Sequence, residues 1–183
     1  MIKLISRTKI HSSANVDDFV IDEQGVLVEY KGAGGDVVIP DGVTFIGHSA
    51  FCDCTSITSV IIPNSVTNIG YWAFGRCTNL TSVIIGNGVI SIWDRAFTEC
   101  KNLTSVTFGN SVTKIEKWAF RNCRSLTSIT IPNSVTKIEW EAFKNCRNLT
   151  SVTFGGSVPI LYSDVFLNTP FIHTAAYKQI LKR

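Results

Sequence analysis

The sequence lacks a long hydrophobic run, and no stretch approaches the roughly 18 apolar residues that a membrane-spanning helix needs. At the N-terminus, apolar residues are interrupted by Lys3, Arg7 and Lys9, which makes the segment a poor secretory signal. The sequence therefore predicts a cytoplasmic protein, or one whose export segment is not part of these 183 residues.

The chain also carries little charge. Asp, Glu, Lys and Arg make up 17% of the residues, and the formal net charge is only +3. This balance lacks the concentrated basic character of nucleic-acid-binding proteins, so nucleic acid is not a favoured partner. The hydrophobic content of 45% is typical of a globular protein.

Residues suited to catalysis or metal binding are sparse. The three histidines, His11, His48 and His173, lie far apart in the sequence, and no phosphate-binding loop, metal motif or nucleophile elbow is present. A catalytic site needs a nucleophile, a base and an orienting group that converge in one pocket. We therefore predict no enzyme activity, no cofactor and no metal site.

What the sequence does contain is a 23-residue repeat. A phenylalanine recurs six times at this spacing, and an alanine precedes the first five. The phenylalanines are Phe51, Phe74, Phe97, Phe120, Phe143 and Phe166. Columns locked to this period predict a solenoid, in which each coil buries residues against its neighbours.

A cysteine column keeps the same period. Its members are Cys54, Cys77, Cys100, Cys123 and Cys146, and Thr169 takes the sixth place. Because all five cysteines occupy one position of the repeat, we predict reduced thiols that point inward and pack as small hydrophobic groups. Cys52 lies beside this column and is expected to be exposed.

Each repeat contains a strand pattern and a turn. The strand segments are 36–40 (DVVIP), 57–62 (ITSVII), 80–85 (LTSVII), 103–108 (LTSVTF), 126–131 (LTSITI) and 149–154 (LTSVTF). Their apolar positions predict a parallel sheet that faces the core. A turn such as Pro-Asn or Gly-Asn follows, and a second apolar pair such as Val112 and Ile115 predicts a short strand on a second wall. The remaining stretch has room for one helical or 3₁₀ turn.

The repeat boundaries divide the chain into four segments. Residues 1–15 are predicted to be a flexible N-terminus, and residues 16–35 a β-hairpin cap with its turn at Gln24-Gly25. Residues 36–157 form the solenoid, and residues 158–183 form the last partial repeat and a C-terminal cap. We expect a short helix in this cap, with Ala176, Tyr177 and Ile180 facing the last coil.

The repeat unit resembles the BspA-like, or Treponema-type, leucine-rich repeat, and residues 126–149 (LTSITIPNSVTKIEWEAFKNCRNL) carry it almost intact. The resemblance implies a mainly β, right-handed solenoid arc with a parallel sheet on its concave side. It also implies interaction rather than catalysis, because similar proteins include bacterial surface proteins that bind host proteins or other cells. By resemblance the protein would therefore be secreted or placed at the cell surface.

Three groups of side chains are candidates for partner binding. The first is the tryptophans, which fall in three different columns and so are not dictated by the repeat: Trp72, Trp93, Trp118 and Trp140. The second belongs to the outward hydroxyl ladders of the strands: Thr104, Thr107, Thr127 and Thr130. The third is basic and suits an anionic partner: Arg121, Arg124, Lys144 and Arg147. Each group also has a purely structural interpretation, as ring packing, a solvated sheet face and a solvated edge, respectively.

The predicted function is a non-enzymatic module that binds a macromolecular partner, most favourably a protein, through the solenoid surface. An alternative is a structural or self-associating segment of a larger surface protein, which would make the chain more than a monomer. A third possibility is binding of a glycan or an ice surface through the Thr/Ser lattice. A glycan or another anionic surface is also a possible partner for the basic residues.

Overall fold

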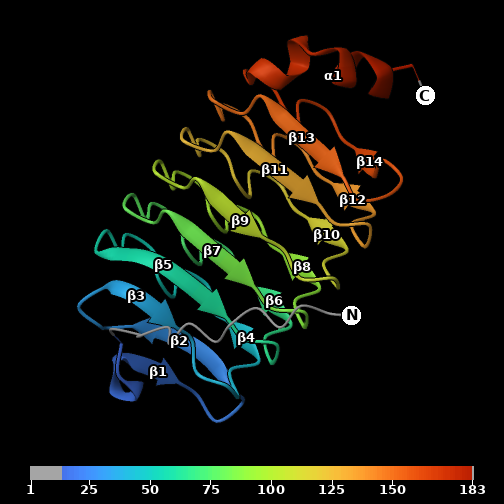
Figure 1. The fold of residues 1–183 in the computed structure, drawn as a ribbon. Coiled ribbons are helices and arrows are strands. Elements are labelled where there is room, and N and C mark those ends of the chain that lie inside the picture. The colour runs from blue at the N-terminus through green and yellow to red at the C-terminus, as the bar shows by residue number, and fades with distance from the viewer. Residues whose placement is uncertain (1–13, 183) are drawn as a thin grey trace, which may run out of the picture.

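The computed structural model describes residues 14–182, in which the chain winds into a β-solenoid with two walls of parallel strands (Figure 1). The first wall, which we call the main sheet, contains β3 (Gly35–Val38), β5 (Ile57–Ile62), β7 (Ser82–Ile85), β9 (Ser105–Thr107), β11 (Ser128–Ile131) and β13 (Ser151–Phe154). The second wall contains β4 (Phe45–Ile46), β6 (Asn68–Ile69), β8 (Ser91–Ile92), β10 (Lys114–Ile115), β12 (Lys137–Ile138) and β14 (Ile160–Leu161). Each coil therefore alternates between the two walls, which confirms the predicted solenoid.

The phenylalanine column runs along the interior between the two walls. All six rings are buried, and consecutive ring centroids lie 4.7 to 5.6 Å apart in stacked geometry. This spacing is close to the distance between neighbouring strands of a sheet, so each coil contributes one ring to the stack. The predicted interior file of aromatic rings is confirmed.

The cysteine column lies beside the phenylalanines, and all six cysteines are reduced. Cys77, Cys100, Cys123 and Cys146 are buried, and each thiol donates a hydrogen bond to the carbonyl oxygen 26 residues earlier, at 3.0 to 3.2 Å. Burial raises the pKa of each of these thiols, to about 12 for Cys146. The structure corrects two details, because Cys54 and Cys52 are both half-buried rather than buried and exposed, respectively.

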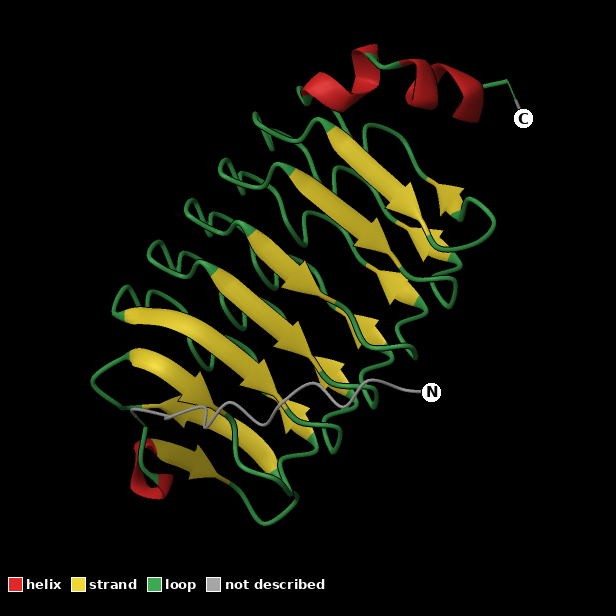
Figure 2. Ribbon diagram, in the orientation of Figure 1, coloured by secondary structure: helices red, strands yellow, loops and turns green. Residues whose placement is uncertain are grey.

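The chain returns from the second wall to the main sheet through consecutive hydrogen-bonded turns (Figure 2). In each complete coil two residues of this return have a positive φ, for example Trp118 (56°) and Asn122 (62°). Asparagine tolerates this left-handed conformation better than most residues do. The amides of Asn122, Asn145 and Asn168 also bond to one another along the column, at 3.0 and 2.8 Å.

A β-hairpin closes the N-terminal end. Strand β1 (Phe19–Ile21) pairs antiparallel with β2 (Val26–Tyr30), which in turn pairs parallel with β4 and so extends the second wall. The carboxylate of Asp22 shapes the turn by accepting hydrogen bonds from the N–H groups of Gln24 and Val26, at 2.9 and 2.8 Å. A short 3₁₀ helix, η1 (Val16–Asp18), precedes the hairpin. The predicted flexible N-terminus lies almost entirely outside the described residues.

The C-terminal cap contains a second 3₁₀ helix, η2 (Pro170–His173), and the helix α1 (Ala175–Ile180), which lie over the end of the solenoid (Figure 1). Phe171 is buried, with its ring centroid 5.2 Å from that of Phe166. Tyr177 and Ile180 pack against the core as predicted, but Ala176 is exposed. The expectation for Ala176 was wrong because η2 begins the cap and gives the position over the last coil to Phe171.

Candidate binding site between β9 and β11

The two walls differ in one respect that matters for binding. The second wall is continuous over eight strands, whereas the main sheet is split into a four-stranded part, β3-β5-β7-β9, and a two-stranded part, β11-β13. The step from β9 to β11 is the same 23 residues as every other step. The split therefore arises from the side chains at this position and not from a change in the repeat length.

Two kinds of hydrogen bond stop at the split. The N–H of Thr104 donates to the Thr81 carbonyl and that of Thr150 to the Thr127 carbonyl, both at 2.9 Å. The Thr104 and Thr150 hydroxyls bond to the same two carbonyls, at 3.0 and 3.3 Å. Within residues 14–182, Thr127 makes neither of these bonds to Thr104.

We attribute the split to Phe108 and Pro132, which face each other across it. The sixth strand position holds isoleucine at 62, 85 and 131, and Phe108 is the one phenylalanine there that has another main-sheet strand beyond it. Its ring makes an edge contact with Phe120, with centroids 6.0 Å apart. Pro132 has no N–H to bond across the sheet. Proline alone is insufficient, because Pro63 occupies the same position and β5 still pairs with β3.

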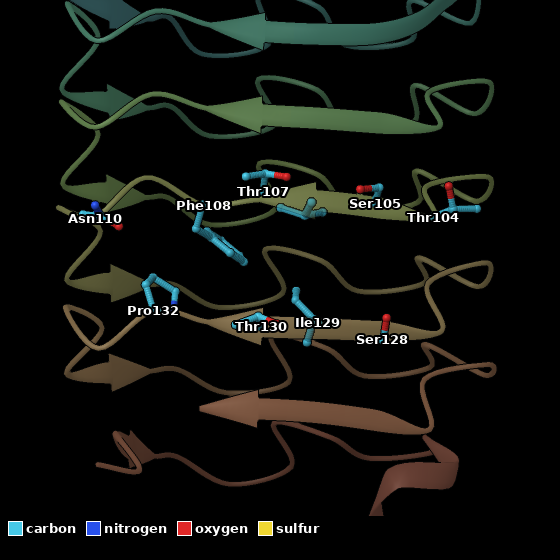
Figure 3. A pocket seen from close by; sticks show the side chains of 10 residues that line it. Thr104, Ser105, Thr107, Phe108, Asn110, Ser128, Ile129, Thr130 and Pro132 are labelled. Atoms are coloured by element: carbon cyan, nitrogen blue, oxygen red, sulfur yellow. The ribbon is translucent and has the colours of Figure 1, made fainter. Parts of the chain in front are cut away.

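A cavity of about 400 Å³ lies over the split on the main-sheet face. Figure 3 shows the Phe108 side chain projecting into the space between the two strands, with Pro132 opposite it. Val106 and Phe108 are half-buried, whereas their counterparts Val60, Val83, Ile62 and Ile85 are buried. The cavity thus combines partly exposed apolar side chains with a rim of hydroxyl groups.

Three of the four predicted threonines line this cavity, namely Thr104, Thr107 and Thr130. Thr127 is exposed on the same face but does not line it. Sequence reasoning missed the apolar lining from Val106, Phe108 and Pro132. The signal was present in the columns, because Phe108 interrupts a series of isoleucines and a proline follows in the next coil.

Trp72 and Trp118 sandwich an arginine. The guanidinium carbon of Arg95 lies 3.9 Å from the ring centroid of Trp118 and 5.7 Å from that of Trp72. The indole N–H of Trp118 donates to the Glu141 carboxylate at 2.9 Å. Both indole rings are half-buried, so much of each ring already packs against other residues of this protein.

The other two tryptophans lie in different surroundings. Trp93 packs within a surface cluster of aromatic rings, with its centroid 5.2 Å from Phe45, 5.3 Å from Tyr71 and 5.6 Å from His48. Trp140 is 44% exposed and lies under the Lys117 ammonium, at 4.4 Å. The four tryptophans are therefore distributed over the surface and do not form one patch.

The predicted basic residues share one edge of the turn region. Arg124 and Arg147 are exposed and occupy the same column, whereas Arg121 is half-buried. The Lys144 ammonium forms an ion pair with the Glu141 carboxylate at 3.0 Å. These four side chains do not approach the cavity between β9 and β11.

The second wall carries an ion network on its outer face. The Lys114 ammonium lies 2.8 Å from Glu116 and 3.2 Å from Glu139, and Lys137 lies 3.4 Å from Glu139. Hydrogen bonding to Glu116 raises the pKa of Lys114. Nearby, burial and the Glu116 carboxylate raise the pKa of Asp94. This charged surface neutralises itself and offers little attraction to an outside ion.

Residues 14–182 contain no group of three or more His, Cys, Asp or Glu side chains arranged to hold a metal ion. None of the helices in this part of the chain is long and apolar enough to cross a membrane. The His48 imidazole is engaged structurally, because its Nδ1 accepts a hydrogen bond from the N–H of Tyr71 at 3.1 Å.

Comparison with known proteins identifies the repeat. The sequence pattern of the BspA type leucine rich repeat region matches residues 35–139 and 73–182, with six copies. No curated protein sequence matches this chain significantly.

Solved structures agree with this assignment. A leucine-rich-repeat protein from T. pallidum is 27% identical, with a TM-score of 0.76, and the match covers 92% of this chain and 94% of that one. A leucine-rich-repeat protein from Bacteroides ovatus is 30% identical, with a TM-score of 0.67. That match covers 75% of this chain and 36% of the Bacteroides ovatus chain. Repeats of this fold generally serve protein interaction. The chain belongs to the BspA-type leucine-rich-repeat family.

Proposed function

We propose that this protein is a non-enzymatic interaction module that binds a protein partner on the main-sheet face, with one anchoring side chain of the partner seated between β9 and β11. The observation that carries the proposal is the cavity of about 400 Å³ between these strands. Binding energy in protein interfaces concentrates where one side chain fills a well-formed pocket surrounded by weaker contacts.

The chemistry of the face supports this assignment. The half-buried side chains of Val106 and Phe108 supply an apolar floor, and threonine and serine hydroxyls surround it. In the paired strands β3, β5 and β7 the equivalent apolar residues are buried. The hydroxyl rim can orient a partner through hydrogen bonds, while the floor takes an aliphatic or aromatic side chain.

The test compares two substitutions in one column of the repeat. Thr107 lines the cavity, and Thr153 occupies the equivalent exposed position on β13, outside it. A partner is first identified by quantitative mass spectrometry of proteins retained by the immobilised wild type, and its purified form is then titrated against each variant. We expect Thr107→Lys to weaken binding at least about tenfold, which corresponds to about 1.4 kcal/mol, and Thr153→Lys to change it less than about twofold. Equal effects of the two variants would refute the assignment.

Self-association is a second candidate, favoured by a larger cavity of about 630 Å³ between the last coil and α1. Leu181, which lines it, is 69% exposed, and Ile160 on the adjacent edge strand is 65% exposed. If this end joins two copies, Leu181→Asp lowers the sedimentation-derived mass at high concentration, whereas Gln179→Asp on the exposed side of α1 leaves it unchanged. A concentration-independent monomer mass for the wild type would exclude this candidate.

A further inference from the structure

The split leaves backbone groups of both strands pointing at each other without a ladder between them. In a parallel sheet, alternate residues direct their N–H and C=O groups to opposite neighbours. The Ser105 N–H donates to the Thr81 carbonyl in the preceding coil, at 3.1 Å. Val106, the next residue, therefore directs its N–H and C=O toward β11.

The same argument applies to the other side of the split. The Ser151 N–H donates back to the Thr127 carbonyl at 3.3 Å, so the odd-numbered positions of β11 serve β13. Ser128 and Thr130 then direct their N–H and C=O groups toward β9. Because no strand pairing joins β9 to β11 within residues 14–182, two sheet edges face one cavity.

Facing sheet edges select one class of ligand. An unpaired edge is a template for another extended chain, because only a peptide backbone offers donors and acceptors at the required repeat. The floor and rim of the cavity alternate between apolar side chains and hydroxyls, as each strand of this sheet does. A strand with the same alternation matches both its backbone and its side-chain surroundings.

We propose that the occupant of the site is an extended peptide segment of alternating apolar and small polar residues, which adds as an extra strand between β9 and β11. This inference rests on the proposed function and names the form of the partner. Insertion requires β9 and β11 to separate to about twice the usual strand spacing, or about 9.6 Å. The two coils stay attached on both sides of the split, since β10 and β12 remain paired and the Ser125 N–H donates to the Lys101 carbonyl at 3.1 Å.

The test uses a fluorescently labelled synthetic peptide with the sequence of residues 124–131, RSLTSITI, taken from the chain itself. Its matched control is the same peptide N-methylated at alternate residues, which keeps the side chains and removes backbone donors. We expect saturable binding by anisotropy, at least about tenfold weaker for the methylated peptide. Amide hydrogen exchange of Val106, Ser128 and Thr130 should slow at least about tenfold when the unmodified peptide saturates the protein.

Two variants of the protein complete the test. Phe108→Ile is expected to close the split and weaken peptide binding at least about tenfold. Thr130→Pro removes one N–H that faces the split and leaves the bonds between β11 and β13 in place, so it provides a second check if Phe108→Ile folds poorly.

Absence of peptide binding, equal affinity for the methylated peptide, or protection at other strands would overturn the strand-addition proposal. These failures are distinguishable from failure of the proposed function. If Thr107→Lys still releases the protein partner, the site stands and only the strand form of the occupant is wrong.

Discussion

The coil that contains β9 and β10 and the coil that contains β11 and β12 are joined along one wall and parted along the other. On the second wall, β10 and β12 are paired, with Lys114 beside Lys137 and Ile115 beside Ile138 in the register. The Thr136 N–H also donates a hydrogen bond to the Thr113 carbonyl at 2.9 Å. On the main sheet, the corresponding bond from Thr127 to Thr104 is missing within residues 14–182. Both walls have the same repeat length, so pairing is decided locally by the side chains at the strand ends.

A repeat protein can therefore lose strand pairing on one wall without losing its fold. The stacked phenylalanines and the second wall hold the coils in register, and their spacing is unchanged across the split, with centroids 5.1 and 5.2 Å apart on either side of Phe120. In a solenoid, each coil contacts only its neighbours, and stability is close to a sum of such contacts. One weakened contact on one wall is therefore tolerated.

The largest effect is expected when the shared interior fails, because both walls depend on it. Phe120 is fully buried between two stacked rings, and Phe120→Ala should lower the free energy of unfolding by about 3–5 kcal/mol. Phe108→Ala is the matched variant at the split, and because Phe108 is half-buried we expect a loss of only about 1–2 kcal/mol. Urea titration followed by circular dichroism measures both, and equal losses would contradict the distinction between interior and split.

Much of this organisation is predictable from sequence for a physical reason. Columns such as Phe51 to Phe166 repeat a burial requirement six times, so one pattern specifies the interior and both walls. Departures from the columns are harder to interpret. Phe108 fits an apolar position, and its effect depends on Pro132 in the following coil, which only the stacked arrangement brings opposite it.

Side-chain contacts along the outer surface were also beyond sequence reasoning. Charged residues near Trp72 and Trp118 suggested an interface, but the contact of Arg95 with both rings requires coils one step apart to be in register. At the C-terminus, the 3₁₀ helix at Pro170–His173 interrupts the repeat pattern. It places Phe171 over the last coil and leaves Ala176 exposed. The spacing of apolar residues therefore predicts that a helix forms, but it does not predict which side of the helix packs against the last coil.

The second largest effect on stability is expected in the turns by which the chain returns from the second wall to the main sheet. Trp118→Ala removes the stack on Arg95 and the hydrogen bond to Glu141, so we expect a loss of about 2 kcal/mol in the free energy of unfolding. Trp140→Ala, at an exposed ring, should change stability by less than about 0.5 kcal/mol. Thermal unfolding of the two variants provides the measurement, and the reverse order would show that Trp118 is not a structural residue.

A smaller effect is expected from a substitution that makes the main sheet continuous, as the second wall already is. Phe108→Ile restores the residue found at 62, 85 and 131, so the main sheet should become continuous and stability should rise by up to about 1 kcal/mol. Residue-resolved hydrogen exchange should show slower exchange at Val106 and Ser128. Phe154→Ile is the control, because β13 has no further main-sheet strand to pair with. Unchanged exchange at β9 and β11 would show that Phe108 does not hold the strands apart.

The smallest effect tests the charged face of the second wall through its pH dependence. Burial, aided by the neighbouring Glu116 carboxylate, raises the pKa of Asp94, so the folded protein binds a proton there more tightly than the unfolded chain does. The ionised carboxylate therefore opposes folding at neutral pH, and this penalty disappears as the pH falls below the ordinary value of about 3.9.

Asp94→Asn should accordingly raise the free energy of unfolding at pH 7 by less than about 1 kcal/mol, because the group is partly solvated. The gain should shrink as the pH is lowered and be absent near pH 4. Asp41→Asn, at an exposed carboxylate, controls for the general effect of removing one negative charge. If the gain in the free energy of unfolding persists at low pH, the charge of the Asp94 carboxylate is not what opposes folding. The ion network would then stabilise the second wall without an opposing contribution from Asp94.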